Sequence, residues 1–245
     1  MTTFDLVPVI DLMGGKVVHA RAGERERYRP LEGSRLCASA EPEAVVAGLL
    51  AFYPFRRIYV ADLDAIRGRG DHRAAIRALA QAFPDVSFWV DAAFSGACAC
   101  RRFLDAGLGE LVLGSESQAD LALVERLQGE ERWVLSLDYR GDEPLGPPAL
   151  FARPDLWPKR VIAMTLARVG LGAGPDIERL RAVRATAPGR RLYAAGGVRG
   201  PDDLLALREL GCAGALVASA LHDGRLDRAA LERLDERQGP VSRPH

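Results

Sequence analysis

Short apolar runs rich in β-branched and aromatic residues alternate with longer amphipathic segments along the whole chain. The apolar runs predict strands at 6–12, 57–63, 86–92, 110–115, 132–138, 160–165, 191–197 and 214–219. Their nearly continuous apolar character indicates burial on both faces, as in a parallel sheet. The amphipathic segments predict helices at 41–53, 71–83, 95–106, 118–128, 176–187, 201–210 and 225–237.

Eight strands that alternate with helices, at about 30 residues per unit, predict a single (β/α)8 TIM barrel. A doubly wound open sheet is the alternative, and eight clean repeats favour the barrel. The segment 140–158 carries five prolines, so we expect only a short or broken helix there. The first and fifth strands both end in Asp, which indicates two related half-barrels. We expect residues 1–237 to form the barrel and 238–245 a flexible tail.

Composition narrows the class of protein. The 33 basic and 33 acidic residues of the 245 cancel, so no electrostatic footprint for nucleic acid is present. Four cysteines are too few for a disulfide scaffold, and the four histidines show no ligand-type clustering, so no metal site is expected. The N-terminus lacks a signal-peptide pattern, and no apolar run approaches the ~20 residues of a membrane span. We therefore expect a cytoplasmic protein without a membrane partner.

Two aspartates lie at or near the ends of predicted strands, in similar sequence settings. Asp11 ends the first predicted strand and Asp138 the fifth. In a (β/α)8 barrel the carboxyl ends of the strands meet at one face, where chemistry gathers. Facing carboxylates can act as a base and an acid on one substrate. Alternatively, each Asp caps an ordinary turn.

Small-residue turns follow the last strands. Gly196 and Gly197 in "YAAGGVRG" expose backbone N–H groups, and Ala218 and Ser219 in "LVASAL" offer a similar turn. Turns after the seventh and eighth strands commonly bind phosphate in this fold, whereas a tight turn that needs glycine is the alternative. The loop "RVGLGAGPD" (168–176) is interpreted as a mobile loop over the site, with Arg168 either reaching an anion or facing solvent.

The chain resembles the HisA/HisF family of histidine-biosynthesis (β/α)8 barrels, and within it a divergent HisA-like paralogue. "VIDLMGGKVVHA" and "YVADLDAI" resemble the family's first two strands, and "LSLDYRG" matches the region of its second Asp. "AMT" ends like its sixth strand, and "AAGGVRG" and "LVASAL" resemble its phosphate site. The likeness runs from about residue 5 to 225, in the same order and spacing.

The resemblance implies an Amadori rearrangement of an aminoaldose phosphate to an aminoketose. Asp11 would be the general base, Asp138 the general acid and Thr165 an assisting polar residue. The acid would protonate the ribose ring oxygen, and the base would remove the C2 proton. No metal or organic cofactor is needed, since only protons move.

The half of the site that holds a second phosphate in the family differs here. Asp91 in "WVDAAFSG" stands where glycine is expected, and "LVLGSES" keeps Gly114 and Ser115 but adds Glu116. A carboxylate ~5 Å from a phosphate charge costs about 3 kcal/mol per charge pair at an effective dielectric of ~20. These residues therefore predict a monophosphate substrate whose other end is an amine or another hydrogen-bond donor.

Three functions follow from these observations. The first is an isomerase of an aminated ribose- or ribitol-type sugar phosphate that is not the standard bisphosphate intermediate. The second, implied by the resemblance, is another HisA-like lyase, cyclase or isomerase in tetrahydromethanopterin-type cofactor biosynthesis. The third is a non-catalytic phosphate-sugar-binding protein. In each case the partner is a small sugar phosphate, and we expect a monomer or homodimer.

Overall fold

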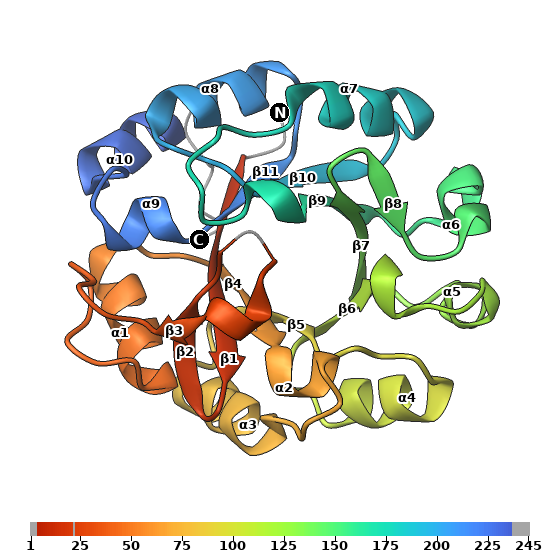
Figure 1. Cartoon of the computed structure of the whole chain (residues 1–245), viewed down its shortest axis with the longest axis horizontal. Helices are drawn as coiled ribbons and strands as arrows, with labels where there is room; N and C mark the ends of the chain where they lie inside the picture. Colours follow the sequence, from red (N-terminus) through yellow and green to blue (C-terminus); the bar gives the residue numbers. More distant parts are fainter. Residues whose placement is uncertain (1–3, 22, 237–245) are drawn as a thin grey trace, which may run out of the picture.

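The computed structural model describes residues 4–21 and 23–236, and in this part of the chain eight parallel strands close into a barrel surrounded by helices (Figure 1). The barrel strands are β1 (Asp5–Met13), β4 (Arg57–Asp62), β5 (Ser87–Asp91), β6 (Glu110–Gly114), β7 (Trp133–Arg140), β9 (Arg160–Thr165), β10 (Arg191–Ala195) and β11 (Gly214–Val217). Strand β1 pairs in parallel with both β4 and β11, which closes the sheet. The predicted TIM barrel is confirmed.

The outer helices follow the predicted order. They are α1 (Pro42–Phe52), α3 (Arg73–Ala82), α4 (Ala97–Asp105), α5 (Ala122–Arg126), α6 (Pro148–Ala152), α7 (Ile177–Thr186), α8 (Pro201–Glu209) and α10 (Arg228–Glu236). In the proline-rich segment, α6 is short and a 3-10 turn (Pro154–Leu156) follows it, as predicted. The expected tail, 238–245, lies outside the described residues, and the relation between two half-barrels stays a prediction.

Several short elements were not predicted. They are the strands β2 (Lys16–His19), β3 (Arg29–Pro30) and β8 (Glu143–Leu145) and the short helices α2 (Leu63–Ile66) and α9 (Ser219–His222). Strand β2 pairs antiparallel with the end of β1, and β8 does so with the end of β7. Both hairpins therefore extend the barrel wall at its carboxyl end, beside the two aspartates of interest.

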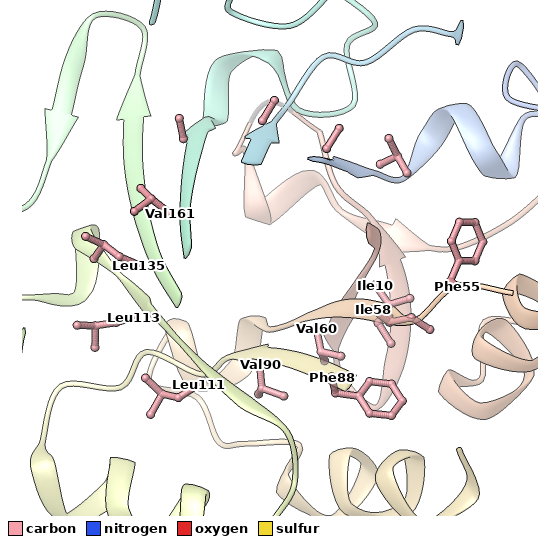
Figure 2. Packing of buried hydrophobic residues seen from close by; sticks show 14 of the residues in the cluster. Ile10, Phe55, Ile58, Val60, Phe88, Val90, Leu111, Leu113, Leu135 and Val161 are labelled. Carbon is pink, nitrogen blue, oxygen red and sulfur yellow. The ribbon is translucent and has the colours of Figure 1, made fainter. Parts of the chain in front are cut away.

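Each barrel strand is buried on both faces, which explains the continuous apolar runs. On β4, Ile58 and Val60 pack in the layer between strands and helices, where Figure 2 shows them among other aliphatic side chains. The alternate residues Tyr59 and Ala61 point into the barrel instead. None of the helices in the described part of the chain is both long and apolar enough to cross a membrane.

The amino ends of the strands carry a layer of charged residues, here called the charged floor: Asp5, Arg57, Glu110, Arg160 and Arg191. Guanidinium nitrogens of Arg57 and Arg191 each lie 3.1 Å from Asp5 Oδ2. Glu110 pairs with Arg160 and accepts the indole N–H of Trp89 at 3.2 Å. The floor therefore closes the end of the barrel opposite the carboxyl ends.

Candidate active site

A pocket opens at the carboxyl ends of the barrel strands, and three aspartates line it: Asp11 from β1, Asp91 from β5 and Asp138 from β7. The structure therefore brings the two predicted catalytic carboxylates to one cavity. Asp91 and Asp138 are 8% and 5% exposed, so neither is solvated as a surface turn cap would be. Asp11 is half-buried, and the catalytic role of Asp11 and Asp138 stays a prediction.

Asp138 is held by donors from its own strand, β7, and from the 3-10 turn Ser115–Ser117 that follows β6. Ser136 Oγ donates to its Oδ1 at 2.6 Å, and the backbone N–H of Glu116 donates to its Oδ2 at 3.2 Å. The Ser115 hydroxyl accepts the Asp138 N–H at 2.9 Å and lies 3.3 Å from Oδ2. Burial raises the pKa of Asp138 to about 7, and the Ser136 hydrogen bond opposes that rise. Ser115 is thus placed to position Asp138, and it does not line the pocket.

Asp11 lies where β1 pairs with β2, opposite Val18. Among the described residues, none donates a hydrogen bond to its carboxylate, so both oxygens are free to meet a ligand. Burial raises the pKa of Asp11 to about 7, and the positive charge of Arg25 opposes that rise. A carboxylate that titrates near 7 can accept or give a proton at neutral pH.

Asp91 faces Asp138 across Gly114. A Cβ at Gly114 would lie 3.2 Å from Asp91 Oδ2 and 3.3 Å from Asp138 Oδ2, so glycine is the residue that leaves both carboxylates room. Tyr59 donates its hydroxyl to Asp91 at 3.2 Å, as does the Ala93 N–H. Burial raises the pKa of Asp91 to about 6. Gly114 acts here as a spacer and is not itself a lining residue.

The predicted phosphate turns line the side of the pocket formed by β10 and β11. Gly196 and Gly197 have φ of 100° and 87°, and Ala218 and Ser219 complete this wall. A Cβ at Gly197 would lie 2.2 Å from the Gly174 carbonyl oxygen, so the turn requires glycine by space as well as by conformation. Ser219 Oγ also meets His19 Nε2 at 3.0 Å.

Two predicted residues lie behind the pocket wall. Thr165 is buried and donates to Asp176 Oδ2 at 3.4 Å, while Asp176 caps α7 by accepting the Arg179 N–H. Arg168 donates to the Gly174 carbonyl at 3.1 Å. Neither Thr165 nor Arg168 lines the cavity, so their contact with a substrate stays a prediction.

The sequence interpretation missed several lining residues, notably Arg25, Tyr28, Tyr59 and Arg225. Arg25 comes from the Arg-rich segment "RAGERERYR" and pairs with Glu116, which lies 91 positions later in the chain. The density of arginine in that segment was the available signal. Its partner is set by the closure of the barrel, which no local pattern reveals.

A family profile and several known proteins are similar to this chain over most of its length. The family profile described as "Histidine biosynthesis protein" matches residues 5–152 and 154–227. An isomerase of 1-(5-phosphoribosyl)-5-((5-phosphoribosylamino)methylideneamino)imidazole-4-carboxamide from Halorhodospira halophila is 30% identical over 96% of this chain and 98% of its own length. An isomerase of the same name from a strain of Thermus thermophilus is 28% identical over 90% of this chain and 95% of its own length. An uncharacterised protein from Methanocaldococcus jannaschii is 29% identical over 91% of this chain and 95% of its own length.

Proposed function

The chain belongs to the histidine biosynthesis protein family, and we propose that it is an Amadori-type aldose–ketose isomerase of an aminated ribose- or ribitol-type monophosphate. The observation that carries this proposal is the convergence of Asp11 and Asp138 on one cavity, each with its pKa raised to about 7 by burial. Two such groups suit a reaction that only moves protons near neutral pH.

The proposed reaction needs one acid and one base. Asp138, in its protonated form, gives its proton to the ring oxygen of the aminoaldose, and the C1–O bond breaks. The nitrogen lone pair forms an iminium at C1 as that bond breaks. Asp11, in its ionised form, then removes the proton from C2, which leaves an enaminol. Protonated Asp11 returns its proton to C1 while the C2 hydroxyl gives its proton to the ionised Asp138, so the 2-ketose forms and both carboxyl groups regain their starting states. The donors from Ser136 and Glu116 N–H stabilise the charge that Asp138 acquires when it gives up its proton.

The phosphate is proposed to bind at the turns after β10 and β11. Gly197 and Ser219 line this side of the pocket together with Arg225, and their backbone N–H groups are proposed to donate to the phosphate. Backbone donors in turns of this kind favour an anion because their partial charges point at it. Binding the phosphate there would leave the sugar between Asp11 and Asp138.

The amino end of the substrate is proposed to face Asp91. A phosphate there would meet a buried carboxylate, whereas an amine or aryl amine would donate to it. This distal end distinguishes the proposed substrate from the compound with two phosphoribosyl groups that appears in the name of the relatives' activity.

The test compares turnover of N-phenyl ribosylamine 5-phosphate and of the relatives' substrate, with carbon-13 NMR to detect a C2 carbonyl. Asp11→Asn should abolish ketose formation and the exchange of a C2 deuterium label, while Asp155→Asn, a change at an exposed aspartate, should leave both unchanged. Turnover of the relatives' substrate alone would refute the distal-end argument. A product without a carbonyl shift would indicate another HisA-like reaction, and equal ligand binding without turnover in any form would indicate a binding protein.

A further inference from the structure

Arg25 and Glu116 form an ion pair in the part of the pocket beside Asp91, here called the distal half. Arg25 begins the 3-10 turn Arg25–Arg27 between β2 and β3, and its guanidinium donates to Glu116, in the turn that follows β6. The two side chains are only 26% and 24% exposed. The pair therefore belongs to the pocket wall and is not a solvated surface contact.

Both members of this pair act on the aspartates of the site. Positive charge on Arg25 lowers the pKa of Asp91, and negative charge on Glu116 raises it. Glu116 raises the pKa of Asp138 as well, and its backbone N–H donates to that residue. The charges of the pair are therefore close enough to Asp91 and Asp138 to affect a substrate bound between them.

The charges of the distal half do not cancel. Asp91 and Glu116 supply two carboxylates, and Arg25 supplies one cation. The other arginine among the described lining residues, Arg225, is held by Asp223 at 2.6 Å. Arg25 is consequently the cation that an anion in the distal half would need, and Glu116 already binds it.

We propose that the Arg25–Glu116 pair is the specificity determinant of the distal half, because Glu116 already engages Arg25, whose guanidinium would otherwise be free to bind a second phosphate there. The distal half then keeps a net negative charge and selects a cationic or hydrogen-bond-donating end. This inference rests on the proposed function, which places the single phosphate at the β10 and β11 turns.

A second contact fixes Arg25 in this position. Glu26, the next residue, pairs with Arg67, which follows helix α2. The turn that carries Arg25 is therefore tied to the turn after β6 on one side and to the residue after α2 on the other. Replacing Glu116 by Gln would keep its backbone donor to Asp138 and this second tie, and would remove only the charge that engages Arg25.

The experiment measures calorimetric dissociation constants for ribulose 5-phosphate and ribulose 1,5-bisphosphate, which differ by one phosphate. In Glu116→Gln the ratio of the bisphosphate to the monophosphate constant should fall roughly tenfold to a hundredfold, the effect of one unit charge some 6 to 10 Å away at an effective dielectric of ~20. Arg25→Gln should raise the ratio. Glu232→Gln, which removes the charge that engages Arg228 in an exposed pair, is the matched control and should leave the ratio unchanged.

A ratio in Glu116→Gln within threefold of that of the unaltered protein would overturn the inference, provided circular dichroism shows a native fold. Failure of the unaltered protein to bind ribulose 5-phosphate would overturn the proposed phosphate site. The proposed role of the Arg25–Glu116 pair would fall with it. If the protein shows no isomerase turnover but Glu116→Gln changes the ratio of dissociation constants as expected, the proposed reaction is refuted. The role of the Arg25–Glu116 pair in specificity is then still supported.

Discussion

The buried charge of Asp91 should make the protein less stable as the pH rises, and Asp91→Asn should remove that dependence. The folded-state pKa is about 6 against an ordinary value of 3.8, so below about pH 3 the group is largely protonated whether the chain is folded or not. Between these values the folded protein binds more protons than the unfolded chain. Stability is therefore lost as the pH rises towards 6 and changes little above 7.

The size of the effect follows from the shift. Two pKa units correspond to about 3 kcal/mol over the full titration, of which about 2 kcal/mol falls between pH 4.5 and pH 8. Asparagine can keep the local contacts, since its carbonyl accepts the Ala93 N–H and its amide can donate to the Tyr59 hydroxyl oxygen. The free energy of unfolding of Asp91→Asn, relative to the unaltered protein, should thus rise by about 2 kcal/mol across this range.

Urea denaturation at pH 4.5 and pH 8, extrapolated linearly to water, measures this difference. Asp85→Asn is the control, because Asp85 is exposed just before β5 and should show the same difference at both pH values. If the stability difference between Asp91→Asn and the unaltered protein does not depend on pH, Asp91 is not a buried charge. The argument for a donor facing it would then fail.

Further predictions concern catalysis and the phosphate turn. The pH–rate profile should be a narrow bell centred near pH 7, because Asp11 must be ionised and Asp138 protonated in the same molecule; a flat profile from pH 5 to 9 would contradict this. Ser136→Ala removes a donor to the ionised Asp138, so the pKa of Asp138 and the alkaline limb of the profile should rise by about one pH unit. An alkaline limb that does not move would show that Ser136 does not tune the catalytic acid. Gly197→Ala should cost roughly 2 kcal/mol of stability and weaken ribulose 5-phosphate binding, as seen by denaturation and calorimetry, whereas Gly189→Ala, at an open position, should change neither.

The fold could be predicted because a barrel strand buried on both faces has a distinctive pattern. Strand β9 runs over Arg160–Thr165, the range expected from the sequence, and α7 covers Ile177–Thr186 where a helix was expected over 176–187. Strand β3 was missed because it has two exposed residues, Arg29 and Pro30, and pairs with β2 outside the barrel. Such a strand has no apolar period to detect.

The candidate site could be predicted only in part. Asp11 and Asp138 were placed correctly at the pocket because each lies near the carboxyl end of a barrel strand, and the fold then determines where they meet. Thr165 also ends a strand, yet its side chain is directed to Asp176, and the direction of a side chain depends on packing that a pattern does not contain. The pairing of Arg25 with Glu116 depends on a long-range contact between two loops, so neither residue alone indicates it.

The charged floor has a consequence for how this chain can change. Along β1, Asp5 binds two arginines at one end and Asp11 faces the pocket at the other. Along β5, Trp89 packs over the floor and Asp91 faces the pocket. Residues that anchor the barrel and residues that select a ligand are thus segregated at opposite ends of the same strands. Mutational drift or directed evolution at the pocket can proceed while the anchoring contacts stay intact, which makes the chain a suitable scaffold for new substrate preferences.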